Sequence, residues 1–410
     1  MPDTFEIELT TMAHGGAALG RHNGRAIFVP YTLPGERALV RVTQDKTRFA
    51  FAEALEIITP SPARVASPCP HFGPGRCGGC HWQHINYASQ LEHKRQIVVD
   101  QLERIGKFVA PEVLPTHPSP ILYGYRSHMT FALAENGLPG LWSDDNSHVV
   151  PIDECHILSP ALAEIYPKLA LFAPDIARIR LQVGSDPADR TVILDVDGDG
   201  APEVEVDLPI SVNLITGDNE PVNLIGSPHV TYQILHRVFR VTAGGFFQAN
   251  LPMTEVLVKE VMSQLGLSGA ETVLDLYSGV GMLTAFVAEQ CGHVTSVESY
   301  PPAVTDAEFN LMDLSNIDII EGSVEAVLAD LDSSYDCAVV DPPHAGLGME
   351  TLDHLLRLAP PRIVYVSHDP ATLARDAQRL VRGGYRLRSA QPLDMSPQTS
   401  HIDVVATLER

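Results

Sequence analysis

The spacing of hydrophobic and polar positions changes along the chain and divides the sequence into three parts. Over residues 5–58, apolar and polar residues alternate in short runs, for example over 5–9 and 38–42, with Gly- or Pro-containing turns between the runs. Alternation of this kind is typical of strands with one buried face. Several short strands at regular spacing predict a small β-barrel, and small barrels often bind single-stranded nucleic acid.

The second part begins with a Pro/Ser-rich linker at residues 59–68. A helical pattern follows over residues 87–107, and residues 121–240 form a β-rich stretch. Its clearest predicted strands are 178–183 and 191–196. We expect this part to be a β-rich middle domain.

In the last part, apolar strand-like runs alternate with helical patterns. The predicted strands are 272–275, 293–298, 337–341 and 362–366. This rhythm predicts βαβ units and a mostly parallel, doubly wound sheet of the Rossmann-like kind. We therefore expect an α/β protein with three domains, which span residues 1–60, 61–240 and 241–410.

Composition narrows the class of protein. An apolar fraction of 45% and a charged fraction of 19% are typical of a folded globular chain. The sequence has no apolar run of membrane-spanning length and no signal segment, so we expect a cytoplasmic protein that does not enter a membrane. Nothing in the sequence indicates an obligate protein partner.

The net charge of −23 argues at face value against a nucleic-acid partner. The acidic residues are unevenly distributed, however. The first 120 residues are nearly neutral, and the remaining residues carry almost all of the net negative charge. Basic residues of the predicted barrel could face an RNA backbone, although a plain solvated surface explains them equally well. These residues are Arg21, Arg25, Arg37, Arg41, Lys46 and Arg48.

A candidate cofactor loop follows the predicted strand 272–275. Residues 275–281 read Asp-Leu-Tyr-Ser-Gly-Val-Gly, and glycines at such a turn let the backbone approach a ligand. A dinucleotide site looks similar, but the third glycine of that motif is absent. Glu298 ends the next strand, where it can accept ribose hydroxyls, and Asp341 ends a later one before Pro342-Pro343, beside a target base. Together these features favour S-adenosylmethionine (SAM).

Four of the six cysteines have the spacing of a metal site. Cys69, Cys77, Cys80 and Cys155 form C-x7-C-x2-C with a distant fourth member. A short C-x2-C pair is more often a ligand pair than a disulfide in a cytosolic protein. Four thiolates suit either tetrahedral zinc or a [4Fe–4S] cluster, and the spacing alone does not choose between them.

These motifs together resemble the RNA 5-methyluridine methyltransferases, which act on transfer RNA and large-subunit ribosomal RNA. Residues 5–58 resemble the TRAM domain of that family, a small OB-type barrel. Residues 246–250 are similar to its Phe-x-Gln-x-Asn element, 275–281 to its glycine loop with Ser278 in place of Cys, and 341–343 to its Asp-Pro-Pro. Asn310 resembles an Asn of the family's next helix. The resemblance covers nearly the whole chain.

The resemblance implies a SAM-dependent RNA methyltransferase with tRNA or rRNA as its partner. It implies a [4Fe–4S] cluster rather than zinc on the four cysteines, since several relatives use a similar C-x5-C-x2-C set. It also implies a set of residues around SAM. These are Gln248, Asp275, Tyr277, Gly279, Gly281, Glu298 and Asp341.

The reacting centre departs from the family pattern. The family uses a Cys thiolate that adds to C6 of uracil and activates C5, followed by proton removal by a carboxylate. In this chain His368 occupies the position of the nucleophile, within Ser-His-Asp-Pro. Asp403 replaces the proton-abstracting Glu, and His344 replaces an Arg. We therefore take His368, Asp403 and Asp341 as the candidate catalytic residues.

Three functions remain open at this stage. The first is an RNA methyltransferase that acts at uracil C5 or at another atom, with His368 as a general base. Alternatively, it is an RNA-binding paralogue that holds SAM without the thiolate-dependent reaction, and His368 simply fills the turn. Methylation of a small molecule or a protein is a weaker third reading, because the barrel and the cysteine set speak against it.

Overall fold

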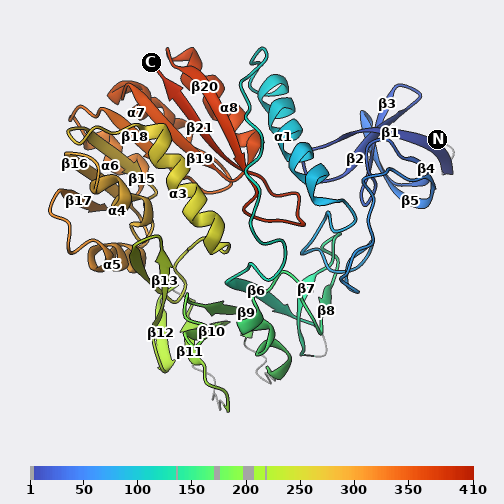
Figure 1. The fold of residues 1–410 in the computed structure, drawn as a ribbon, viewed down its shortest axis with the longest axis horizontal. Helices are drawn as coiled ribbons and strands as arrows, with labels where there is room; N and C mark the ends of the chain where they lie inside the picture. Colours follow the sequence, from blue (N-terminus) through green and yellow to red (C-terminus); the bar gives the residue numbers. More distant parts are fainter. Residues whose placement is uncertain (1–3, 135–136, 170–175, 197–206, 218) are drawn as a thin grey trace.

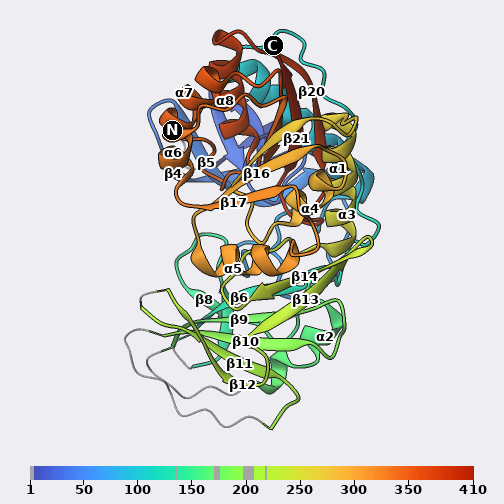
Figure 2. The ribbon, with the colours of Figure 1, turned by 90° about the vertical axis from the view of Figure 1, so that its left-hand side faces the viewer.

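The computed structural model describes residues 4–134, 137–169, 176–196, 207–217 and 219–410. The three largest of the four β-sheets in the described residues occupy different parts of the molecule: an N-terminal barrel, a middle sheet and a C-terminal sheet flanked by helices (Figure 1). A view turned by 90° shows the C-terminal sheet stacked above the middle sheet (Figure 2). No helix of the described residues is both long and apolar enough to cross a membrane.

The predicted N-terminal barrel is confirmed. Its strands close in the order β1-β2-β3-β5-β4 around a core that includes Leu9, Ile27 and Val40. Sequence reasoning missed one strand, because Ala18–His22 lies in a glycine-rich stretch that reads as a loop. The strands are β1 (Thr4–Met12), β2 (Ala18–His22), β3 (Arg25–Val29), β4 (Arg37–Asp45) and β5 (Phe49–Thr59).

Helix α1 (Tyr87–Arg104) follows the cysteine-rich loop. Asn86 caps its first turn by accepting a hydrogen bond from the backbone N–H of Ser89. The helix ends three residues before the predicted limit of 107. The early end is explained by Gly106 and by Lys107, which takes a positive φ of 60°.

The middle region is a sheet in the order β12-β11-β10-β9-β6-β7-β8. The two strands predicted most clearly are β9 and β10, which pair antiparallel at its centre. Two short helices lie against it, α2 (Pro160–Ala163) and the 3-10 helix η1 (Tyr166–Lys168). The strands are β6 (His128–Leu133), β7 (Pro139–Trp142), β8 (Val149–Pro151), β9 (Ile176–Val183), β10 (Arg190–Val196), β11 (Ser211–Ile215) and β12 (Pro221–Ile225).

A separate hairpin, β13 (His229–Ile234) with β14 (Arg237–Thr242), leads into the C-terminal region. The sheet there runs β17-β16-β15-β18-β19-β21-β20, with five parallel strands and an antiparallel β21. It confirms the predicted Rossmann-like sheet. Its strands are β15 (Thr272–Leu276), β16 (His293–Glu298), β17 (Ile317–Glu321), β18 (Cys337–Val340), β19 (Arg362–Ser367), β20 (Arg386–Leu393) and β21 (Asp403–Glu409).

Helices pack on both faces of this sheet (Figure 1). Apolar side chains from β15, β18 and β19 point alternately to the two faces, so the sheet separates two hydrophobic cores. The helices are α3 (Leu251–Leu265), α4 (Met282–Ala288), α5 (Pro301–Asn310), α6 (Val324–Asp330), α7 (Met349–Leu358) and α8 (Pro370–Arg382).

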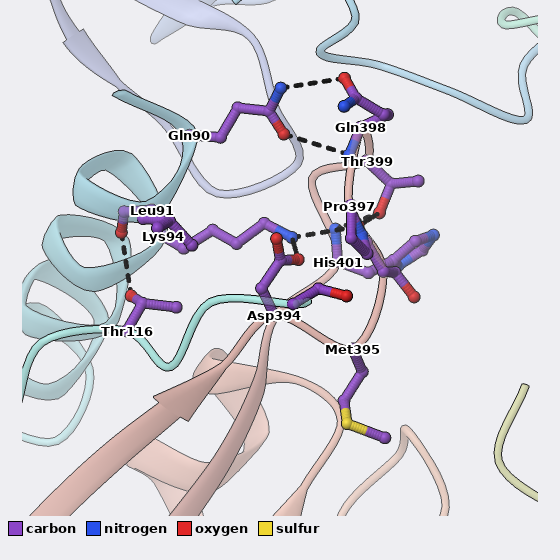
Figure 3. Close-up of polar contacts among 12 residues, drawn as sticks. Gln90, Leu91, Lys94, Thr116, Asp394, Met395, Pro397, Gln398, Thr399 and His401 are labelled. Carbon is purple, nitrogen blue, oxygen red and sulfur yellow. Dashed lines mark hydrogen bonds and ion pairs between the residues drawn. The ribbon is translucent and has the colours of Figure 1, made fainter. Parts of the chain in front are cut away.

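Helix α1 is joined to the C-terminal region by a buried ion pair. Nζ of Lys94 lies 2.6 Å from Oδ1 of Asp394, and both side chains are fully buried. The same ammonium donates to the backbone carbonyl of Ser396 at 3.1 Å, while Gln90 exchanges hydrogen bonds with Gln398 (Figure 3). These contacts hold the connection between β20 and β21 against the helix.

We predict that Lys94→Met lowers the free energy of unfolding by about 3–5 kcal/mol, because it leaves the Asp394 carboxylate buried without its partner. Arg104→Met on the same helix is the matched control, since the side chain of Arg104 is exposed and makes an ion pair with Asp100 and a long hydrogen bond of 3.4 Å to Gln101. Its effect should stay within about 0.5 kcal/mol. Urea unfolding of both variants checks this, and equal effects would show that the buried pair contributes nothing special.

Candidate active site

A cavity at the carboxyl ends of β15 and β18, the cofactor cavity, is bordered by most of the residues predicted to bind SAM. These are Gln248, Asp275, Tyr277, Gly279 and Asp341. Two others do not border it. Gly281 packs under α5, where an added Cβ would lie 2.8 Å from Leu311, and Glu298 lies behind the loop.

The glycine loop is held in an unusual backbone conformation. Tyr277, Gly279 and Gly281 all have positive φ, at 63°, 56° and 80°. A carboxylate oxygen of Glu298 accepts the backbone N–H of Gly279 at 2.9 Å, and the other oxygen accepts that of Tyr300 at 2.8 Å. Glu298 therefore locks the loop to the end of β16, a role that sequence reasoning did not foresee. Its predicted contact with ribose stays a prediction.

Asn310 secures the same loop from the opposite side. Its amide donates to the carbonyl of Val280 at 3.0 Å and to that of Arg240 at 3.0 Å. Its oxygen accepts the N–H of Arg240 at 2.8 Å. Asn310 thus ties the hairpin β13–β14 to the glycine loop.

Asp275 fits the role of a ligand-binding carboxylate. It is fully buried, and its Oδ2 accepts a hydrogen bond from Thr284 at 2.6 Å. Its Oδ1 is buried without any hydrogen-bond partner, at the wall of the cofactor cavity. Burial raises the pKa of Asp275 to about 7. A buried oxygen without a hydrogen bond lowers the stability of the fold unless a donor from a bound ligand reaches it.

Gln248 and Gly279 also leave room for a ligand. The side-chain amide of Gln248 makes no hydrogen bond to another described residue, although only 8% of the residue is exposed. An added Cβ at Gly279 would meet no atom within 4 Å. The residues present therefore fit a polar cofactor, with donors and acceptors on one wall and open backbone on another.

His368 lies between two carboxylates beside this cavity. Nδ1 of His368 is 2.5 Å from Oδ1 of Asp403, and Nε2 is 3.0 Å from Oδ1 of Asp341. The first contact is a hydrogen bond. The second is an ion pair that is poorly aligned for hydrogen bonding, so Oδ1 of Asp341 has no well-directed donor. The structure thus brings together the three predicted catalytic residues.

The electrostatics of this group follow from its contacts. Burial alone lowers the pKa of His368, but the charge of Asp341, together with the charge and hydrogen bond of Asp403, outweighs it and raises the pKa well above the ordinary value. The ring is therefore protonated at neutral pH. The positively charged ring thus lies between the side chains of Asp341 and Asp403.

The surroundings of His368 contain aromatic rings and no thiol. The rings of His344 and Phe246 lie 5.5 and 6.4 Å from its ring, centroid to centroid. All six cysteines lie in the described residues, and Cys337 starts β18, at the opposite end of that strand from Asp341. Cys291 precedes β16, also at the far edge of the sheet. Neither replaces the missing nucleophile.

A contact from the barrel reaches the same turn. His14, in the loop between β1 and β2, lies 3.1 Å from the carboxylate of Asp369, the residue after His368. Asp369 also caps α8 by accepting the N–H groups of Ala371 and Thr372. No local pattern could have revealed this contact, because it joins residues from different domains.

The barrel's basic residues are less available than predicted. Arg25, Arg37 and Arg41 form ion pairs with Asp45, Glu6 and Glu53. Arg21 donates to the carbonyl of Gly24. Lys46 and Arg48 are exposed at the turn between β4 and β5. The internal acids therefore neutralise half of the predicted basic set.

The four cysteines Cys69, Cys77, Cys80 and Cys155 border one small cavity, the cysteine cavity, at the edge of the middle sheet. Burial, reinforced by the neighbouring thiols, raises the pKa of Cys77 to about 11 and that of Cys80 to about 12. Within the described ranges, no group of three or more His, Cys, Asp or Glu side chains is arranged as a metal site. The four cysteines thus lie around one cavity, but their sulfur atoms are not arranged as the ligands of a bound metal.

Comparison with known proteins identifies two family matches and several similar RNA methyltransferases. Residues 3–55 match the TRAM domain, and residues 229–410 match the tRNA (Uracil-5-)-methyltransferase family. An uncharacterized RNA methyltransferase of Streptomyces coelicolor is 36% identical, over 99% of this chain and 93% of the relative. Another from Halalkalibacterium halodurans is 33% identical, over 99% of this chain and 97% of the relative.

The crystal structure of Pyrococcus abyssi tRNA (uracil-54, C5)-methyltransferase in complex with S-adenosyl-L-homocysteine has the same overall fold. The two share 25% identity and a TM-score of 0.75, over 98% of this chain and all of the other. The fold and the cofactor cavity define a SAM-dependent methyltransferase. The chain belongs to the family of RNA methyltransferases that its full-length relatives represent.

We predict that Asp275→Asn stabilises the protein at neutral pH. The wild-type carboxyl has an ordinary pKa of 3.8 and a folded-state pKa of about 7, so stability falls as the pH rises between these values. The variant lacks this loss, and its advantage should grow over that window to on the order of 4 kcal/mol.

Unfolding measured at several pH values checks this, with Asp330→Asn as the control at an exposed position. The variant should at the same time bind S-adenosylhomocysteine more weakly, as titration calorimetry will show. A stability difference that does not vary with pH would contradict the buried, uncompensated charge at Asp275.

Proposed function

We propose that this RNA methyltransferase transfers the methyl group of SAM to a nitrogen atom of an RNA base and not to C5 of uracil. One observation supports this most directly. The residue in the position of the family's nucleophile is an imidazole bound on both sides by carboxylates, Asp341 and Asp403. A protonated ring held in this way has no free lone pair with which to add to C6.

The chemistry of C5 explains why the thiol matters. Carbon C5 of uracil becomes nucleophilic only after a nucleophile has added to C6, and the described site contains no thiolate to do so. A ring or exocyclic nitrogen carries its own lone pair. It needs only a positioned methyl donor and a base for the proton that it loses.

Gln248, Asp275, Tyr277 and Gly279 would hold SAM in the cofactor cavity. When bound there, SAM supplies an electrophilic methyl group on a sulfonium. The unpaired oxygen of Asp275 suits a cationic donor, because a cation would favour the ionised carboxylate. The hydroxyl of Tyr277 contacts that of Thr351 at 3.4 Å, which fixes the direction of the side chain.

Asp341 is the proton acceptor in this proposal. It borders the cofactor cavity, and its Oδ1 has no well-directed hydrogen bond. The acceptor nitrogen gains a methyl group and loses its proton, which Asp341 takes up as a member of the Asp341–His368–Asp403 group. His368 keeps the group's charge balanced, and Asp403 orients the ring through Nδ1, as the carboxylate does in other His–carboxylate pairs.

RNA as the substrate rests on the family, the barrel and the names of the relatives. We also propose that the reaction takes place in the cytoplasm. We further assign three domains, residues 1–60, 61–240 and 241–410, because the barrel, the middle sheet and the C-terminal sheet fall within these limits.

Trapping with RNA that contains 5-fluorouridine tests this proposal. The wild-type enzyme should form no covalent adduct on a denaturing gel, since it has no group that adds to C6. His368→Cys restores a thiol at that position and should form the adduct. An adduct with the wild-type enzyme would contradict the proposal. The absence of any adduct with His368→Cys, in a variant that still binds RNA, would contradict the placement of the target base beside residue 368.

We further propose that Cys69, Cys77, Cys80 and Cys155 hold a [4Fe–4S] cluster. Four thiols that share one buried cavity support this, as does the C-x2-C pair. Anaerobically purified protein should contain iron and acid-labile sulfide in equal amounts and should absorb in the visible range. Cys80→Ser should lose this signal, and Cys291→Ser, which alters a core cysteine, should keep it. Zinc without iron would contradict the cluster.

A further inference from the structure

A second cavity, the arginine cavity, adjoins the reacting centre. It has a volume of about 370 Å³ and lies between the middle sheet and the turn that follows β14. Arg126 and His128 line it from the start of β6, Arg180 lines it from β9, and Phe246 and Phe247 close it on the catalytic side. None of these residues was singled out for this purpose by the sequence motifs.

The two arginines have no acidic partner. Neither guanidinium forms an ion pair or a hydrogen bond with another described residue, and Nε of Arg126 is buried without an acceptor. Arginines nearby behave differently: Arg178 pairs with Asp195 and Arg240 with Asp306. In a chain of net charge −23, two half-buried arginines without a counter-ion are a notable exception.

The positive charges of Arg126 and Arg180 affect the titration of His128, which lines the same cavity. Burial and the proximity of Arg126 and Arg180 together lower the pKa of His128 to about 3. His128 is therefore neutral and can donate a hydrogen bond, while the arginines supply the positive charge. Guanidinium groups in such a setting favour a phosphate, whose geometry they match with paired N–H groups.

The arginine cavity adjoins the site of the reaction across Phe246 and Phe247. Phe246 and Phe247 border both this cavity and the cofactor cavity. Phe246 is 64% exposed, and its ring lies 6.4 Å from that of His368. A nucleotide whose base reaches Asp341 would pass this phenylalanine, which brings its neighbouring backbone to the arginines. Gly79 and Leu141 also border the cysteine cavity, so the cysteine loop shapes one wall.

We propose that the arginine cavity binds a phosphodiester group of single-stranded RNA next to the methylated nucleotide, with Arg126 and Arg180 as its ligands. This rests on RNA being the substrate and does not depend on which base atom is methylated. The contact carries no sequence information. It fixes the strand so that one base enters the reacting centre.

Arg180→Gln and Arg178→Gln form a matched pair for the test, since both remove one positive charge from the same strand, two residues apart. The probe is a short fluorescein-labelled oligouridine, and its affinity is measured by fluorescence anisotropy at several salt concentrations. Arg180→Gln should weaken binding roughly tenfold or more, the size of a lost charge-assisted hydrogen bond. The slope of log K against log salt should fall by about 0.7. Arg178→Gln should change neither quantity.

A second measurement keeps the test decisive if Arg180→Gln is poorly folded. Oligouridines with one neutral methylphosphonate linkage should bind the wild-type enzyme more weakly when the linkage falls in the arginine cavity. Arg180→Lys keeps the positive charge, so it should keep most of this loss. Equal weakening by both glutamine variants, or insensitivity to every neutral linkage, would overturn the proposal. Unchanged binding of S-adenosylhomocysteine in the variants shows that the catalytic region is intact, so methylation of any base atom remains testable on its own.

Discussion

The buried ion pair between Lys94 and Asp394 is the constraint on which the arrangement of the reacting centre depends. It joins a helix that follows the cysteine-rich loop to the connection between the last two strands of the catalytic sheet, across 300 residues of sequence. Removing two charges from water is costly, and the 2.6 Å contact of the pair and the carbonyl of Ser396 offset part of that cost. Such a pair favours one docking position, since any displacement leaves both charges unsatisfied.

The connection between β20 and β21 positions Asp403 beside His368. From Asp394 the chain passes through Gln398, which α1 and the loop before it hold by hydrogen bonds, and enters β21 at Asp403. Asp403 then orients His368, and His368 balances the charge of Asp341 beside the cofactor cavity. A histidine in this position therefore places a positive charge between the carboxyl groups of Asp341 and Asp403, which a thiol would not do.

Much of the fold follows from local pattern. The barrel, the Rossmann-like sheet and the glycine loop were all predicted, because alternation and strand–turn–helix rhythm are properties of neighbouring residues. Strands β17, β20 and β21 were not identified, since their apolar runs are short, polar-ended or interrupted by Pro392. The glycine loop, Glu298 and Asp341 were predicted from their places at strand ends and Gln248 from the resemblance, but the backbone role of Glu298 and the packing of Gly281 depend on tertiary contacts. The contact of His14 with Asp369 and the unpaired arginines depend on how domains meet, which local sequence does not encode.

The most direct test of the account is the identity of the methylated nucleoside. Purified enzyme is incubated with RNA that lacks its own modifications and with SAM carrying an isotopically labelled methyl group, and the RNA is digested to nucleosides for mass spectrometry. We predict label in a nucleoside methylated on a base nitrogen, and loss of that label in Asp341→Asn. Label in 5-methyluridine would contradict it, because it would show that C5 is activated without a thiolate at position 368.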